Sequence, residues 1–151
     1  MSNYRLEDDF IRRTRMNLEF IRKHQKDHPD EVFEVTQFIN SLLGLLVYPK
    51  EHLIKKIPNS TIEILESQGW NLPVIVGWRS DEERNLYQLI RHLRNSVSHV
   101  TFDFSTRNSE IEKISFQDMS GFKVIFDLIS LESFIFRFVN ELENVLQNHE
   151  R

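Results

Sequence analysis

The 151-residue sequence contains no cysteine and only four glycines and four prolines. Without cysteine the protein forms neither disulfide bonds nor a thiolate zinc cluster, so packing must stabilise the fold and a reducing compartment is expected. The scarcity of glycine and proline, and the lack of repeats and low-complexity tracts, argue against a flexible linker. The sequence therefore predicts one compact domain, residues 1–151.

Long hydrophobic runs and a positive net charge are also missing. The most apolar segment, residues 120–146, is interrupted by charges before any run reaches about 18 residues, the length that a membrane-spanning helix needs. Residues 1–10 are polar and acidic and lack the apolar core of a secretory signal, so we expect a cytoplasmic protein without a membrane partner. The net charge of -4 argues against broad attraction to nucleic acid, because that affinity comes from lysine and arginine. Any RNA contact should be local.

Apolar residues with helical spacing dominate the first half of the sequence. This spacing predicts an amphipathic helix over residues 4–26 and a second, largely buried helix from about Pro29 to Tyr48. Residues 58–77 are irregular, and Ser60 begins a capping box for a short helix. We expect this region to form a packed connection.

A further helix contains the candidate chemistry. Ser80 and Glu83 have capping-box spacing, which predicts a helix that continues to about His99. At about 100° per residue, its apolar side chains form one stripe that should face the core. This stripe consists of Leu86, Leu89, Ile90, Leu93, Val97 and Val100. The polar groups that suit a phosphate lie opposite or beside it and are Gln88, Arg91, His92, Arg94, Asn95 and His99.

The C-terminal third contains a strand pattern followed by a helix pattern. Residues 101–104 and 111–116 alternate apolar and polar side chains around a turn-rich segment, which predicts a small β-hairpin. From Asp118, a candidate N-cap, to Gln147 the spacing predicts one long helix or two helices that meet near Ser130. The expected fold is mainly α, an antiparallel helical bundle with a small hairpin after the helix that ends near residue 99.

Arginine and histidine near the end of that helix are suited to binding a phosphate and moving a proton. Histidine can move a proton near neutral pH, and arginine offers a charged fork to a phosphate. Arg94 and His99 are about 140° apart on an ideal helix, so they meet only if Arg94 reaches round, the helix distorts, or a symmetric partner contributes.

The segment LRNSVSH, residues 93–99, resembles the R-x4-H signature of HEPN domains, including the polar residue after the arginine. Over most of the chain, the order of predicted elements resembles one plasmid-borne bacterial HEPN subgroup. The resemblance implies a HEPN-type helical bundle that forms a homodimer in which two motifs share a cleft. It also implies a metal-independent endoribonuclease in which Arg94 and His99 are catalytic and Asn95 supports them. In the implied reaction, attack of a ribose 2′-hydroxyl on the neighbouring phosphate leaves a 2′,3′-cyclic phosphate and needs no metal ion. Further supporting candidates on this helix are Arg91, His92 and Ser98.

The resemblance implies an RNA substrate and a role in a bacterial toxin or phage-defence or stress system. The implied partner is a nucleotidyltransferase-type antitoxin. An alternative is a HEPN homodimer that binds a protein or a nucleotide without cleaving RNA, which the acidic net charge favours.

Two other roles for arginine and histidine side chains, an ion pair with a helix cap and a metal site, are also considered. Arg94 can form an ion pair with a helix carboxylate while His99 caps the helix C-terminus, where a cation interacts well with the helix dipole. His24 and His28 have the i, i+4 spacing of metal ligands, but no HExxH pattern accompanies them. We therefore expect neither a metal ion nor a cofactor.

Overall fold

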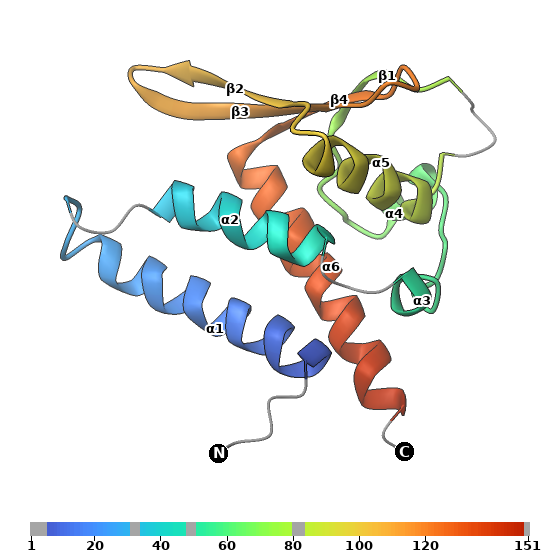
Figure 1. Ribbon diagram of the computed structural model, residues 1–151, viewed down its shortest axis with the longest axis horizontal. Helices are drawn as coiled ribbons and strands as arrows, with labels where there is room; N and C mark the ends of the chain where they lie inside the picture. Colours follow the sequence, from blue (N-terminus) through green and yellow to red (C-terminus); the bar gives the residue numbers. More distant parts are fainter. Residues whose placement is uncertain (1–5, 31–33, 48–50, 80–83, 150–151) are drawn as a thin grey trace.

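The computed structural model describes residues 6–30, 34–47, 51–79 and 84–149. Within these ranges the chain is mainly helical, with a four-stranded antiparallel sheet on one side of the helices (Figure 1). The mainly α class is therefore confirmed. The helices are α1 (Leu6–Gln25), α2 (Glu34–Val47), α3 (Glu51–Ile54), α4 (Ile62–Ser67), α5 (Leu86–Ser98) and α6 (Leu128–His149). The strands are β1 (Val74–Gly77), β2 (Phe102–Arg107), β3 (Glu110–Gln117) and β4 (Lys123–Asp127).

The long helices α1, α2 and α6 contact one another (Figure 1). The first predicted helix, residues 4–26, agrees closely with α1, and the described part of the second ends at Val47. Ile11 and Leu18 of α1 are buried, as the helical spacing requires. Within the described residues, no helix is both long and apolar enough to cross a membrane.

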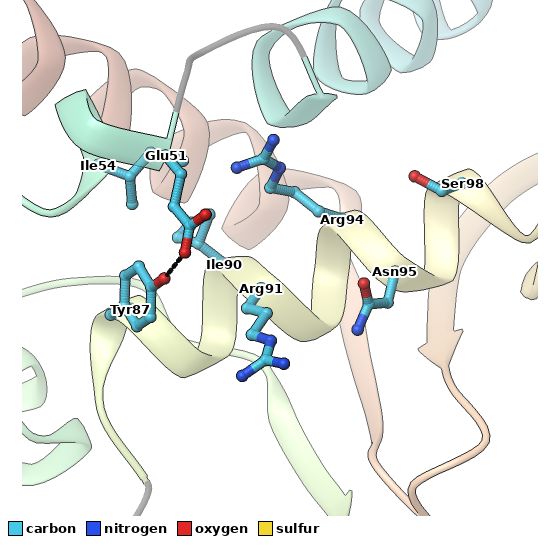
Figure 2. Close-up of a pocket in the computed structure, with 8 residues that line it drawn as sticks. All are labelled: Glu51, Ile54, Tyr87, Ile90, Arg91, Arg94, Asn95 and Ser98. Carbon is cyan, nitrogen blue, oxygen red and sulfur yellow. Dashed lines mark hydrogen bonds between the residues drawn. The ribbon is translucent and has the colours of Figure 1, made fainter.

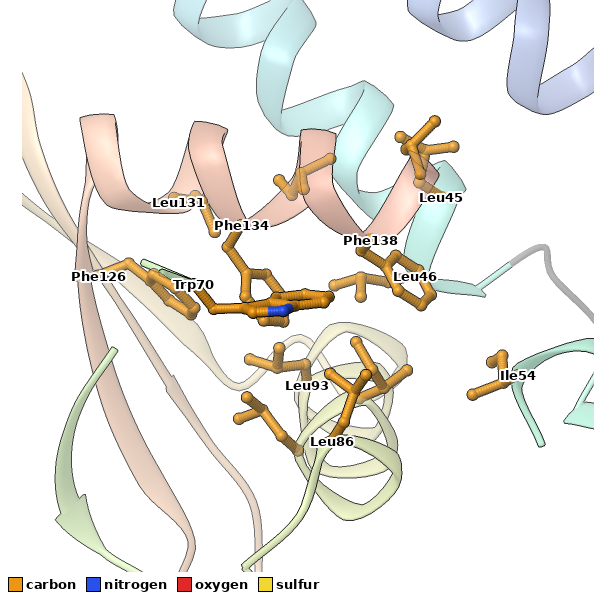
Figure 3. Packing of buried hydrophobic residues seen from close by; sticks show 14 of the residues in the cluster. Leu45, Leu46, Ile54, Trp70, Leu86, Leu93, Phe126, Leu131, Phe134 and Phe138 are labelled. Atoms are coloured by element: carbon orange, nitrogen blue, oxygen red, sulfur yellow. The ribbon is translucent and has the colours of Figure 1, made fainter. Parts of the chain in front are cut away.

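Aromatic side chains from distant parts of the sequence fill the centre of the core. The ring of Trp70 lies 5.6 Å from that of Phe134, and Phe126 lies 5.4 Å from Phe134, measured between ring centroids. Figure 3 shows Trp70 between the side chains of α6 and those of α5, including Leu93. The core therefore joins the sheet, α5 and α6 into one packed unit.

The predicted hairpin strands belong to a larger sheet with the order β1-β4-β3-β2. β2 and β3 pair antiparallel, and β4 pairs with β3 on the other side. The packed connection expected over residues 58–77 contains a strand that the sequence analysis missed, since β1 pairs with β4. Gly77 of β1 has no room for a side chain, because a Cβ there would lie 2.7 Å from the carbonyl oxygen of Gly121.

The expected helix from Asp118 is wrong at its beginning, because residues 123–127 form a strand. Val124 and Phe126 are fully buried while Asp127 is exposed, so this short segment follows the period of two of a strand. α6 begins only at Leu128, and Asp127 caps it by accepting a hydrogen bond of 2.8 Å from the N–H of Ser130. Of the two expected forms, one continuous helix is observed.

The predicted start of the helix that ends near residue 99 is also wrong. α5 begins at Leu86, and its N-cap is Asn85, whose side chain accepts a 3.0 Å hydrogen bond from the N–H of Gln88. Arg84 and Asn85 are not helical because they pair with the segment before α4, through a bridge between Thr61 and Asn85. The capping box at residues 80–83 lies outside the described residues. α4 is likewise capped one residue later than expected, at Thr61.

Two isoleucines of α6 provide a matched test of this core. Ile135 is 2% exposed and Ile129 is 81% exposed. Ile135→Ala should lower the free energy of unfolding by about 2–5 kcal/mol, because it removes buried methyl groups and leaves a cavity. Ile129→Ala should change it by less than about 0.5 kcal/mol. Urea unfolding of both variants measures these effects, and equal losses would contradict the assigned face of α6.

Candidate functional site

The apolar stripe of α5 determines which of its residues face outward. Leu89, Ile90 and Leu93 are almost completely buried, and α5 contacts both α2 and β3. Side chains opposite the buried stripe point away from the core, and Asn95, Ser98 and His99 are accordingly exposed. Ser96, also in the motif segment, is fully buried. The predicted stripe is confirmed for Leu86, Leu89, Ile90 and Leu93, whereas Val100 is 74% exposed and lies beyond the helix.

A hydrogen-bond network anchors the C-terminal end of α5. Ser96 is fully buried, and its hydroxyl donates to the carbonyl oxygen of Thr101 at 3.0 Å and accepts from the N–H of Gln117 at 3.2 Å. The chain reverses at Val100, which has a φ of 55°. These contacts join the end of α5 to the sheet, so the motif lies on a firmly held helix.

Four candidate residues of α5 line one open pocket, which we call the α5 pocket (Figure 2). It has a volume of about 390 Å³. In Figure 2, Arg94 and Ser98 lie on the same side of α5 as Glu51, whereas Arg91 and Asn95 point away from that side. The full lining consists of Glu51, Ile54, Tyr87, Ile90, Arg91, Arg94, Asn95 and Ser98. The pocket combines two guanidinium groups with amide and hydroxyl groups, a set suited to a phosphate.

Glu51 is the acidic group in the α5 pocket. The hydroxyl of Tyr87 donates a hydrogen bond to its carboxylate, and the ammonium group of Lys55 lies 3.4 Å away. The Tyr87 hydrogen bond, followed by the Lys55 contacts and a contribution from Arg94, lowers the pKa of Glu51. The same hydrogen bond raises the pKa of Tyr87. Glu51 is therefore a carboxylate at neutral pH that orients Tyr87 at the edge of the pocket.

His92 faces a different part of the molecule. Its Nδ1 lies 2.5 Å from Oδ2 of Asp118, in the turn between β3 and β4. Asp118 also accepts hydrogen bonds from the N–H of Ser120 at 2.9 Å and from its hydroxyl. Burial raises the pKa of Asp118, but the hydrogen bonds from Ser120 and His92 outweigh burial and lower it overall. Asp118 is therefore ionised at neutral pH.

His99 is the C-cap of α5, is exposed and does not line the α5 pocket. The structure thus brings Arg91, Arg94, Asn95 and Ser98 together and leaves the two histidines of the helix outside their pocket. Asp118 was predicted as a helix cap, and its contact with His92 was not predicted. The two residues are 26 positions apart, so no local spacing indicates their contact.

The residues that the structure describes include no cluster of three or more histidines and carboxylates placed to hold a metal ion. Comparison of the chain with models of known protein families identifies its family. The family model described as HEPN pEK499 p136 matches residues 1–149, so the chain belongs to this HEPN family, and the resemblance seen in the sequence is confirmed. No curated protein and no solved structure matches the chain.

The lowered pKa of Asp118 predicts a specific dependence of stability on pH. Because the carboxylate has a lower pKa in the folded state than the unfolded value of about 3.9, its contribution is complete above about pH 5 and is lost as the pH falls through the folded pKa. The difference in unfolding free energy between the wild type and Asp118→Asn should therefore shrink from pH 6 to pH 3. Urea unfolding across this range measures it, and a constant difference would show that the folded-state pKa is unshifted.

Proposed function

We propose that this protein is a metal-independent endoribonuclease in which Arg94 and His99 are the catalytic residues and Asn95 supports them. The observation that supports the proposal is the arrangement on α5, where a pocket with two arginines adjoins a helix end that presents an exposed histidine. Membership of a HEPN family adds support. Because net charge is negative, the cations of the α5 pocket provide the local RNA contact that the whole surface does not.

The chemistry requires a group that moves protons and a group that stabilises negative charge. The ribose 2′-hydroxyl gives its proton to the imidazole of His99 as its oxygen forms a bond to phosphorus. The bond from phosphorus to the 5′-oxygen breaks, and that oxygen takes up the proton from the imidazolium. The His99 imidazole supplies the proton transfer, and the Arg94 guanidinium stabilises the charge that grows on the phosphate. The products are a 2′,3′-cyclic phosphate and a free 5′-hydroxyl. DNA lacks the attacking hydroxyl and is not cleaved.

The positions of the two residues favour a site shared by two subunits. Arg94 lines the α5 pocket and His99 does not, and on an ideal helix they are about 140° apart. A two-fold axis beside α5 places Arg94 of one subunit near His99 of the other, because a symmetric interface pairs the same surfaces in reverse. We therefore propose a homodimer with two equivalent clefts or one shared cleft.

The proposed setting is a bacterial toxin or phage-defence or stress system in the cytoplasm. A ribonuclease of this kind needs a restraint, and the proposed partner is a nucleotidyltransferase-type antitoxin. The family resemblance and the family match support this setting.

Two single substitutions test the catalytic assignment. Arg94→Ala and His99→Ala should each lower kcat for cleavage of a labelled RNA in EDTA by about 10²-fold or more, since each removes a group that acts in the transition state. Arg12→Ala and His24→Ala, both on α1, are matched controls that should cleave at the wild-type rate. Growth arrest on induction should follow the same order.

Two other results of the cleavage experiment would contradict the proposed catalytic role. Equal cleavage by the wild type and both α5 variants would exclude these residues as the catalytic pair. A wild type that binds RNA or a nucleotide without cleaving it would instead support the non-catalytic binding module.

The shared site predicts a dimer in solution. Light scattering during size-exclusion chromatography should give twice the mass of one chain. Mixing Arg94→Ala with His99→Ala should restore part of the activity, because a mixed dimer contains one site with both wild-type residues. A protein that remains monomeric at the concentration of the cleavage assay contradicts the shared site.

A further inference from the structure

The His92–Asp118 pair has the geometry of a catalytic dyad, although the function proposed above does not use it. Nδ1 of His92 lies 2.5 Å from a carboxylate oxygen of Asp118, and the side chains are only 14% and 7% exposed. Asp118 is itself held by the N–H and the hydroxyl of Ser120. A carboxylate fixed in this way holds an imidazole in one orientation.

The pair also determines which nitrogen of His92 carries the hydrogen. Because Asp118 is ionised, it can only accept a hydrogen bond, so Nδ1 must donate. In the neutral ring, Nε2 then has the free lone pair. Nε2 has no hydrogen-bond partner in the described chain, and it is not among the buried unpaired atoms, such as the Nε1 atoms of Trp70 and Trp78. The His92 side chain is 14% exposed, and Nε2 is the ring nitrogen left to accept a proton.

Aromatic contacts hold the His92 ring from two directions. The ring stacks on Phe122 with centroids 4.5 Å apart and an angle of 9°, and it meets the edge of Trp78 at 5.7 Å. The turn that carries Asp118 is covered by Arg79, whose Nε would lie 3.1 Å from a Cβ at Gly121. The ring thus has little freedom to rotate, and Arg79 is the cation packed over this turn.

The position of His92 along α5 relates it to His99. The two residues are seven positions apart, so on an ideal helix they differ by about 20° in direction and by about 10 Å along the axis. Arg94, in contrast, is about 140° from His99. His92 and His99 therefore lie on the same side of α5, with Asn95 between them along the helix.

We infer that the imidazole of His92, oriented by Asp118, is the general base that removes the proton from the ribose 2′-hydroxyl. This inference rests on the proposed ribonuclease function and divides its proton transfers between two histidines. Nε2 of His92 accepts the 2′-hydroxyl proton as the bond from the 2′-oxygen to phosphorus forms. His99 donates a proton to the 5′-oxygen as the bond from phosphorus to that oxygen breaks. His92 is then a catalytic residue and Asp118 a positioning residue.

The test uses a substitution that removes Nε2 and retains the bond to Asp118. In His92→Asn, the side-chain NH₂ takes the place of the Nδ1–H donor, so the contact that joins α5 to the β3–β4 turn is preserved. For cleavage of a labelled RNA in EDTA, kcat should fall by about 10²–10⁴-fold with little change in KM. The bell-shaped pH–rate profile should lose its ascending limb, because the base that must be deprotonated is gone. Arg12→Ala is the control for unchanged activity.

A second measurement tests the positioning role of Asp118 without any assay of activity. Nitrogen-15 NMR of the histidine side chains, recorded at a pH where the ring is neutral, should show hydrogen on Nδ1 of His92 in the wild type. In Asp118→Asn, the population should shift toward hydrogen on Nε2, because the amide donates a hydrogen bond as well as accepting one. The same variant should lower kcat and leave KM nearly unchanged.

The possible results separate the inference from the proposed function. If the wild type cleaves RNA and Arg94→Ala and His99→Ala do not, normal kcat and an unchanged pH profile in His92→Asn overturn the inference alone. A wild-type His92 with hydrogen on Nε2 also overturns it, whether or not any variant folds. If the wild type cleaves no RNA, the proposed function fails and the general base fails with it.

Discussion

Burial of one face of α5 is the constraint on which the site depends. Leu89 and Leu93 are at most 1% exposed, and hydrogen bonds of Ser96 join the end of the helix to the sheet. Only a distortion of α5 could bring Arg94 and His99 of one subunit together, and a distortion that exposed the apolar stripe would cost about 25 cal/mol for each Å² of apolar surface. The directions of the two residues are therefore fixed by the core. This is why the proposed site involves a second subunit, and why the proposed general base is His92, which lies on the same side of α5 as His99.

The sequence predicted those features that depend on local spacing. A period of about 3.6 residues is enough to locate α1 and the buried stripe of α5, because the positions that define a helical face lie within a few residues of one another. The R-x4-H motif is also local, because it lies within residues 93–99. The family resemblance that rests on it is confirmed by a family match over residues 1–149. The predicted helix already places Arg91, Arg94, Asn95 and Ser98 on one element. Their pocket was not predicted, because part of its lining comes from α3.

Features that depend on pairing between distant segments were missed or misplaced. The prediction of a helix over residues 123–127 is wrong because this segment is too short for the periods of helix and strand to be distinguished. Its strand form depends on pairing with β1 and β3. α5 begins late because Arg84 and Asn85 bond to the segment before α4. The contact between His92 and Asp118 spans 26 positions and arises only when the β3–β4 turn closes beside α5. In each case a tertiary contact prevailed over a local preference.

The chemistry of the RNA ends produced by cleavage tests the central claim most directly. The purified protein is incubated in EDTA with an RNA oligonucleotide and with the same oligonucleotide carrying a 2′-deoxyribose at the cleaved position, and the products are identified by mass spectrometry. Attack by the 2′-hydroxyl predicts a 2′,3′-cyclic phosphate and a 5′-hydroxyl from the first substrate and no cleavage of the second at that position. A 3′-hydroxyl with a 5′-phosphate, or cleavage at the 2′-deoxyribose, would contradict the account.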